Sequence, residues 1–230
     1  SVKYIDEASP ELSGNHGVYV QRLMEGCPIG QFYTYEWAGY DENGTSQYYV
    51  HDANTGERTG ETTIDPQDKD RTKVGSAQPK LTLGWNNTLT YNNWSLNMFF
   101  QGVFGNKVFN GLRAQGNAIT MLSQGKNVFA EALTEQRYGD VNSQKPSDRY
   151  IENGSYLRLS SMTLTYRFGK IGDWVNNLSV YATCNNVFTL TSFKGTDPEV
   201  NLGGLTPGIV WRNNYYPRTR TFMVGMKVNF

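Results

Sequence analysis

The end of the chain alternates strictly between apolar and polar side chains. One set of alternate positions is wholly apolar, namely Phe222, Val224, Met226, Val228 and Phe230. The intervening set is Met223, Gly225, Lys227 and Asn229. A period of two predicts a β-strand with one apolar face and one mostly polar face. Such a strand suits a soluble β-sandwich, and it equally suits a membrane β-barrel whose apolar face contacts lipid.

Two further stretches, 80–91 and 94–104, alternate as cleanly. In the first, the apolar face consists of Leu81, Leu83, Trp85, Leu89 and Tyr91. In the second, it consists of Trp94, Leu96, Met98, Phe100 and Phe104. Only Asn92 and Asn93 separate the two runs, and asparagine favours turns. The pattern predicts two strands joined by a tight turn.

The stretch 154–168 keeps its alternation only in part. Four alternate residues fall on one face, namely Met162, Leu164, Tyr166 and Phe168. Leu157 and Leu159 are out of phase with this set. One extra residue in a strand shifts the alternation by one position and forms a β-bulge. We therefore expect a bulge near Ser160.

The same reading along the whole chain predicts seven strands separated by short and long connections in turn. The predicted strands are about 17–25, 29–40, 80–91, 94–104, 154–168, 177–190 and 216–230. The three long connections are about 41–79, 105–153 and 191–215. Outer-membrane barrels have short turns on one side and long loops on the other, whereas compact soluble domains seldom hold structureless connections of this length. We expect an all-β fold, an antiparallel transmembrane β-barrel.

Strand parity predicts how such a barrel is oriented. If the short turns are periplasmic, the last strand ends in the periplasm and the long loops are extracellular. Because each strand crosses the membrane once, counting back through seven strands puts the N-terminal end of the first strand outside the cell. Bacterial barrels made from one chain have an even number of strands. The sequence is therefore expected to be the C-terminal part of a longer barrel chain.

Composition narrows the function classes. The 21 Lys and Arg residues balance 21 Asp and Glu residues, and this zero net charge argues against a nucleic-acid partner. Charged residues make up only 18% of the chain, while aromatic residues make up 13%. No apolar run reaches the length of a transmembrane helix. Aromatic residues cluster where predicted strands end, as expected for the belts at two membrane interfaces.

The polar faces of the predicted strands would point into the barrel. The residues expected to face inward are Lys80, Asn86, Asn97, Gln101, Arg167, Lys227 and Asn229, with Glu36 as a further member. A barrel interior that holds water or a plug tolerates such polar side chains. The set is therefore expected to contact water and a plug rather than a specific ligand.

Signals of catalysis or metal binding are weak. His16 and His51 have no neighbouring Ser or Cys nucleophile and are expected at the surface, and no phosphate-binding glycine loop occurs. Cys27 and Cys184 lack metal-type spacing. The carboxylates of 61–70, namely Glu61, Asp65, Asp68 and Asp70, lack the glycine of a calcium loop and are expected in a solvated acidic loop, with a bound divalent ion as the alternative. We predict no enzyme activity, no cofactor and no metal site.

The best candidate for ligand binding is the polar and aromatic end of the last long connection. Its residues are Trp211, Arg212, Asn213, Asn214, Tyr215 and Tyr216. Aromatic rings beside amides suit the stacking and hydrogen bonding of sugars, and they suit peptides nearly as well. The same residues also suit an interfacial aromatic belt. In the loop before them, apolar spacing over 127–138 predicts a short helix.

Eight stretches together resemble, in order, the C-terminal part of SusC/RagA-type TonB-dependent transporters of Bacteroidetes outer membranes. They are Gly26–Tyr33, Trp37–Tyr40, Arg71–Gly75, Pro79–Asn87, Phe99–Asn106, Ser147–Leu159, Asp197–Asn201 and Tyr216–Phe222. Each stretch is weak alone, and the series is specific. One departure is Met223, which stands two residues before Gly225, where the usual assembly signal has a polar residue.

The resemblance implies a plugged barrel of about 22 strands in the outer membrane. It also implies TonB-dependent import of large nutrients, either oligosaccharides or peptides, under a SusD-like lipoprotein lid. The plug and the TonB contact would lie in an N-terminal region outside this sequence, so the chain would supply barrel wall and outer loops, surrounded by lipid. The alternative is a soluble, secreted β-sandwich that binds carbohydrate through its loops.

Overall fold

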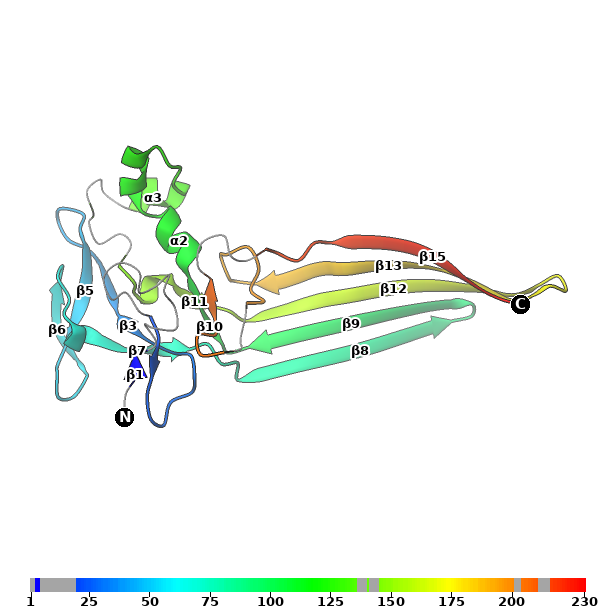
Figure 1. The fold of residues 1–230 in the computed structure, drawn as a ribbon, viewed down its shortest axis with the longest axis horizontal. Helices are drawn as coiled ribbons and strands as arrows, with labels where there is room; N and C mark the ends of the chain where they lie inside the picture. Colours follow the sequence, from blue (N-terminus) through cyan, green and yellow to red (C-terminus); the bar gives the residue numbers. More distant parts are fainter. Residues whose placement is uncertain (1–2, 5–19, 136–139, 141–144, 201–203, 211–215) are drawn as a thin grey trace. The chain divides into compact units, whose positions relative to one another are not determined.

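The structure, a computed structural model, describes residues 3–4, 20–135, 140, 145–200, 204–210 and 216–230 (Figure 1). The chain divides into two compact units. We call the first the loop unit; it comprises Ser1–Pro79, Gly105–Gly154 and Phe193–Tyr216. We call the second the sheet unit; it comprises Lys80–Phe104, Ser155–Ser192 and Pro217–Phe230. Each unit is therefore assembled from three separate stretches of the sequence.

The sheet unit is one antiparallel sheet of five long strands, which run side by side in Figure 1. The strands are β8 (Leu81–Tyr91), β9 (Trp94–Phe104), β12 (Tyr156–Ile171), β13 (Val175–Thr191) and β15 (Thr221–Asn229). Their order is β15-β13-β12-β9-β8. Among the five strands of this sheet, each is therefore the neighbour of the next one along the chain, as in the wall of an up-and-down barrel.

The register of the sheet separates apolar from polar side chains across all five strands. One row of paired residues is Leu89, Leu96, Leu164, Ala182 and Val224. The next row is Thr88, Asn97, Thr163, Thr183 and Met223. Adjacent rows point to opposite faces of a sheet. The sheet therefore has one apolar face and one mostly polar face.

A bulge in β12 keeps its two halves on the correct faces. The pairing of β12 shifts between Leu159 and Ser161 against both β9 and β13, which confirms the bulge predicted near Ser160. Beyond the shift, Leu159 pairs with Phe100 and Phe188, so it rejoins the apolar face. Without the extra residue, the first part of the strand would turn its apolar side chains to the polar face.

The loop unit contains several small sheets. They pair β1 (Lys3–Tyr4) with β2 (Arg22–Leu23), β3 (Gln31–Tyr35) with β7 (Arg71–Ser76), β4 (Trp37–Tyr40) with β5 (Ser46–His51) and β6 (Arg58–Thr63), and β10 (Lys107–Asn110) with β11 (Ile151–Asn153) and β14 (Ile209–Val210). Its helices are short: α2 (Gly111–Gly116), α3 (Ala130–Glu135) and the 3₁₀ turns η2 (Asp68–Asp70), η3 (Ile119–Gln124) and η4 (Asp148–Tyr150). In the described ranges, no helix has the length and apolarity needed to cross a membrane.

The structure corrects two expectations about these regions. The predicted strands 17–25 and 29–40 do not join the large sheet: 29–40 divides at Glu36 into β3 and β4, and of 17–25 only β2 is a strand among the described residues. The long connections 41–79 and 105–153 are not structureless, because they contain strands and helices. A period of two predicts a strand without naming its partner, and these short strands find partners within the loop unit.

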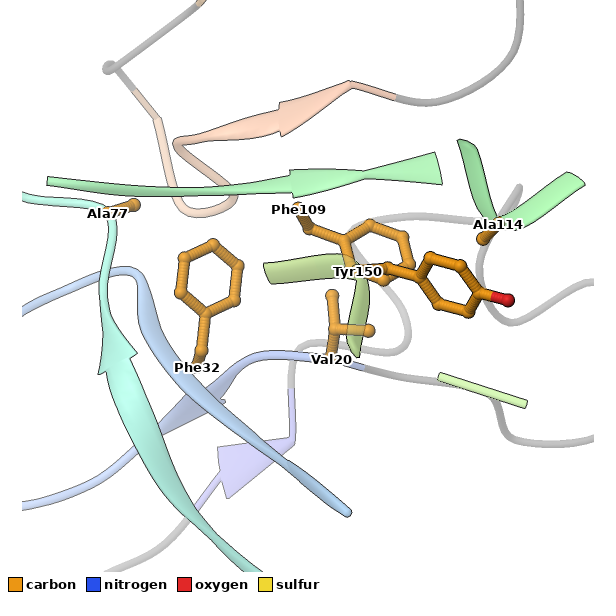
Figure 2. Packing of buried hydrophobic residues seen from close by; sticks show 6 residues of the cluster. All are labelled: Val20, Phe32, Ala77, Phe109, Ala114 and Tyr150. Carbon is orange, nitrogen blue, oxygen red and sulfur yellow. The ribbon is translucent and has the colours of Figure 1, made fainter. Parts of the chain in front are cut away.

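A hydrophobic core holds the loop unit together. Figure 2 shows the side chains of this core, namely Val20, Phe32, Ala77, Phe109, Ala114 and Tyr150. They come from all parts of the unit except its last segment, and Ala114 places one side of α2 against the core. A second cluster consists of Val108, Phe193, Val200 and Val210. The long connections thus fold as a packed body.

Candidate functional site

The apolar face of the sheet unit is open in the described chain. Trp85 is 55% exposed, Phe222 is 73% exposed and Val224 is 81% exposed. Burial of apolar surface stabilises by about 25 cal/mol per Å², so a sheet face of this kind in water marks an interaction surface. In a membrane barrel such a face contacts the hydrocarbon chains of the lipid, which are as apolar as the side chains themselves.

The polar face carries mainly hydroxyl and amide groups. Asn97 donates a hydrogen bond to Thr88 at 2.8 Å, and Thr163 and Thr183 share one at 2.9 Å. The five strands contain no Asp or Glu, and their charged residues are all cations: Arg158, Arg167, Lys170 and Lys227. This face can hold water and neutral groups, as the interior of a barrel does.

Arg158 is a functional candidate that the sequence reading missed. The bulge at Ser160 puts it on the polar face, where it is 1% exposed. Its Nε donates to Thr189 Oγ1 at 2.9 Å, and its guanidinium lies 5.3 Å from the centroid of the Tyr156 ring. Gln101 donates to the Tyr156 hydroxyl at 3.3 Å. A signal did exist, since a bulge that returns Leu157 and Leu159 to the apolar face must place Arg158 opposite them.

Aromatic rings gather near the short turns of the sheet. Tyr166 lies 4.7 Å from Trp94 and 4.7 Å from Phe168, measured between ring centroids. These rings line an apolar hollow of about 430 Å³ that also includes Leu164, Val180 and Val224. A hollow with almost no polar lining suits an acyl chain better than a polar ligand.

The predicted ligand segment lies largely outside the described residues. Trp211, Arg212, Asn213, Asn214 and Tyr215 all fall there. Tyr216 is described and is 82% exposed. The segment therefore stays a prediction.

A second hollow of about 430 Å³, which we call the Phe129 pocket, lies within the loop unit. Its wall includes Leu112, Arg113, Phe129, Glu131, Lys194 and Thr196. These residues come from α2, from α3 and the residue just before it, and from the segment after β13. The sequence reading placed Phe129 and Glu131 in the short helix predicted over 127–138 but named none of these residues as part of a site, because three distant stretches form the wall.

Arg113 organises the polar side of the Phe129 pocket. It forms a bidentate ion pair with Glu131, in which its Nε donates to Oε2 at 3.0 Å. This hydrogen bond lowers the pKa of Glu131 to about 2. The Nη1 atom of Arg113 also donates to the Arg149 carbonyl at 3.1 Å and lies 3.4 Å from Glu152. The guanidinium is therefore held in one orientation.

Glu152 links the remaining wall segments. Its Oε2 accepts a hydrogen bond from the Lys194 backbone N–H at 2.8 Å, and its Oε1 accepts one from Asn110 Nδ2 at 3.2 Å. The Asn110 side chain also accepts from the Arg113 backbone N–H, which caps α2. One carboxylate thus ties together β10, β11 and the segment after β13.

A third polar cluster centres on Glu36. Arg58 Nε donates to Glu36 Oε2 at 2.8 Å, and this pair lowers the pKa of Glu36. His51 Nε2 lies 2.9 Å from the same oxygen. Glu36 therefore belongs to a cluster of the loop unit and not to the polar face of the sheet, where it was expected. The other two members of the cluster, His51 and Arg58, belong to β5 and β6.

Two loop residues expected in solvent are buried. His51 is 2% exposed and Asp70 is 1% exposed. The buried Asp70 carboxylate accepts hydrogen bonds from the backbone N–H groups of His51 at 3.1 Å and Gln67 at 2.8 Å. The prediction of a surface histidine and of a wholly solvated acidic loop was therefore wrong at these positions. In the described part of the chain, no group of three or more His, Cys, Asp or Glu residues could hold a metal ion. His16 lies outside that part.

Comparison with known proteins gives sequence relatives but no family model that matches the chain. TonB-dependent receptor P3 of Formosa agariphila is 28% identical over 93% of this chain and 24% of its own length. TonB-dependent receptor SusC of Bacteroides thetaiotaomicron is 29% identical over 99% of this chain and 22% of its own length. The chain thus spans about a quarter of the length of these relatives.

Solved structures share the fold. The structure of the RagAB peptide transporter matches 91% of this chain and 26% of its own, with a TM-score of 0.69 and 24% identity. The structure of the RagAB peptide importer in the open-open state matches 92% of this chain and 23% of its own, with a TM-score of 0.69 and 23% identity. The fold of the chain is therefore that of one part of a large barrel.

Proposed function

This chain is of the SusC/RagA type of TonB-dependent transporters, and on that premise we propose that it forms wall and outer loops of an outer-membrane importer. The sheet unit would supply five strands of the barrel wall. The loop unit would supply the outer surface that meets the nutrient. The relatives carry the names of receptors and transporters rather than of enzymes.

The observation that carries the proposal is the continuous separation of faces across the five strands. The row from Leu89 to Val224 is apolar in every strand, and the neighbouring row from Thr88 to Met223 is mostly polar. A soluble β-sandwich would bury the apolar face under a second sheet. Here that face is exposed, with Val224 at 81%, which supports contact with lipid over the soluble alternative.

The orientation follows from the lengths of the connections. We infer that the turns at 92–93 and 172–174 face the periplasm and that the loop unit faces the cell exterior. The C-terminus would then be periplasmic. Short periplasmic turns and long outer loops are the rule for outer-membrane barrels.

The partners and cargo are proposed from the relatives. A SusD-like surface lipoprotein would close over the nutrient, and TonB would act through a part of the full-length transporter other than these strands and loops. Oligosaccharides and peptides are both candidate cargo, as the family resemblance implies, and the name of the RagAB peptide transporter supports the peptide. The Trp211 to Tyr216 segment is proposed to contact the cargo. The residues of this chain would bind and guide without covalent chemistry.

The first experiment is the extraction of the native polypeptide that carries this sequence. We expect it to leave the outer membrane only with detergent, at several times the 26.0 kDa of this chain, and to bring a lipoprotein with it. A detergent-free protein of about the chain's own mass would contradict the importer and favour the soluble sandwich. Deletion of the gene should then abolish growth on one polymer. Deletion of a gene for a purely structural barrel would leave growth on every polymer unchanged.

A further inference from the structure

Charged residues are divided unevenly between the two units of the chain. The sheet unit contains one acidic residue and seven Lys or Arg residues, namely Lys80, Arg158, Arg167, Lys170, Arg218, Arg220 and Lys227. The acidic residue, Asp173, lies in the turn between β12 and β13, at the end of the sheet where β15 finishes. At the other end, where β15 begins, the sheet unit has cations and no carboxylate. Such an excess of positive charge favours an anionic partner.

Two of these cations, Arg218 and Arg220, come directly before β15. Neither a turn nor a bend interrupts the stretch from Tyr216 to Thr221, and both arginines are exposed. In an extended chain, residues two positions apart point to the same side. Phe222 is on the apolar face, so the alternation of β15 puts both arginines on the side of that face.

Arg220 is held in place by β13, which lies next to β15 in the sheet (Figure 1). The pairing of the two strands ends at Asn185, and Asn186 follows with a φ of +52°. The Asn186 side chain donates to the Arg218 carbonyl at 2.8 Å, and the Asn186 carbonyl accepts from Arg220 Nε at 3.3 Å. Within the part of the chain that the structure describes, Arg220 makes no other side-chain hydrogen bond. Its Nη1 and Nη2 atoms therefore remain available to a ligand.

The surroundings of Arg220 are apolar and exposed. Phe222, two residues further along the same chain segment, is 73% exposed. On β13 the apolar face continues past Asn186 with Phe188 and Leu190, of which Leu190 is 60% exposed. A charged group among lipid hydrocarbon is costly, so an arginine in this position extends to the headgroups and pairs with an anion there. A guanidinium offers phosphate two parallel N–H donors.

We propose that Arg220, with Arg218 next to it, binds the phosphate group of a lipid whose acyl chains lie along the apolar face. The inference rests on the proposed place of the sheet unit in a membrane barrel. In the proposed orientation the site is in the outer leaflet, where the phosphorylated lipid is lipid A, the anchor of lipopolysaccharide. The position favours a lipid over a free phosphate ion, because the neighbouring apolar side chains add affinity only for a ligand that carries hydrocarbon.

The test is native mass spectrometry of the full-length protein in detergent. The probes are bisphosphorylated lipid A, the same lipid A with its phosphates removed, and inorganic phosphate. We expect the phosphorylated lipid to bind, the dephosphorylated lipid to bind about tenfold more weakly or less, and inorganic phosphate alone not to bind. Equal binding of the two lipids would overturn the proposal, and so would binding of inorganic phosphate alone. This comparison uses the unmodified protein and does not depend on the folding of any variant.

Variants then assign the binding to Arg220. Arg220→Gln should weaken binding of phosphorylated lipid A by about tenfold or more, whereas Arg220→Lys should lose less because an ammonium still pairs with phosphate as a point charge. Lys227→Gln is the matched control, since it removes the same charge from the polar face of the same strand. Unchanged affinity in Arg220→Gln, or an equal loss in Lys227→Gln, would overturn the site.

Failure of the lipid site can be told apart from failure of the importer function. A protein that has the expected large mass and needs detergent, yet binds both lipids equally, would overturn the lipid site alone. A protein that is soluble without detergent would overturn the membrane barrel and the lipid site together.

Discussion

Gly208 shows how single residues in the loop unit are set by backbone geometry. Its φ is +71°, a conformation in which residues other than glycine are strained. An added Cβ would lie 2.6 Å from the Ala77 Cβ and 3.0 Å from the Lys107 carbonyl oxygen. Gly208 therefore combines a turn with a close approach to the core, and its carbonyl accepts a hydrogen bond from Phe109 N–H at 2.9 Å.

We expect Gly208→Ala to destabilise the loop unit by about 1–3 kcal/mol, because the new methyl group overpacks a site that cannot relax. Hydrogen exchange at the Phe109 amide should become about tenfold faster or more. Gly125→Ala is the control, since its φ is +70° but no atom lies within 4 Å of the added Cβ. Equal effects of the two variants would show that crowding at Gly208 is unimportant.

Glu131 gives the loop unit a defined response to acid. Its pKa is lowered from 4.5 to about 2 by the hydrogen bond from Arg113. A carboxylate with a lowered pKa in the fold stabilises the fold above its unfolded pKa. That contribution should therefore be lost as the pH falls from about 4.5 to about 2.

The measurement is hydrogen exchange at the Phe129 amide between pH 5 and pH 2, corrected for the intrinsic rate. Wild-type protein should lose protection over this interval. In Glu131→Gln, protection should be lower at pH 5 and should change little on acidification. A wild-type profile that matches the variant throughout would contradict a stabilising role for the ion pair.

At the scale of elements, β12 depends on its extra residue. The bulge returns Leu157 and Leu159 to the apolar face and keeps Arg158 on the polar face. Deletion of Ser160 would shift this part of the strand by one position and exchange its faces. A buried arginine would then point to lipid, which is costly.

We expect deletion of Ser160 to prevent assembly, seen as loss of the folded, heat-modifiable band of the full-length protein in outer membranes. Ser160→Ala keeps the number of residues and should assemble normally. Normal assembly of the deletion variant would contradict the role of the bulge in setting the faces.

The two faces of β15 can be compared at neighbouring positions. Val224 is on the apolar face and Met223 is on the polar face of the same strand. Val224→Arg should destabilise the assembled barrel by about 2–4 kcal/mol if the position lies near the bilayer midplane. Met223→Arg, which introduces the same charge, should cost far less. Denaturant unfolding in lipid vesicles measures both, and equal costs would contradict a lipid-facing row.

At the scale of the whole molecule, the proposed orientation places the two ends of the sheet on opposite sides of the membrane. Asn54 lies in an exposed turn of the loop unit, and Asp173 lies in the turn between β12 and β13 with a side chain that is 96% exposed. A membrane-impermeant maleimide should therefore distinguish cysteines at these positions in intact cells.

We expect labelling of Asn54→Cys and no labelling of Asp173→Cys, both made in a Cys27→Ser background because Cys27 is partly exposed. Permeabilised cells serve as the control and should allow labelling of both. Labelling of Asp173→Cys alone in intact cells would reverse the orientation.

The strands of the sheet unit could be predicted closely. Those predicted at 80–91 and 94–104 are observed as Leu81–Tyr91 and Trp94–Phe104. The regions 29–40 and 41–79 could not, because their strands are short and pair within the loop unit. The Phe129 pocket was equally invisible, since its wall joins α2, α3 and the segment after β13. No local pattern relates such distant stretches.

The sequence by itself determined which side chains share a face, including the need for a bulge near Ser160. It could do so because alternation and its interruption are properties of the extended backbone within one strand. Only the tertiary structure decided that β3 pairs with β7, that His51 and Asp70 are buried, and that Arg113 and Phe129 share a pocket. These features depend on contacts between residues far apart in the chain, and their free energy comes from packing and hydrogen bonds that no local period records.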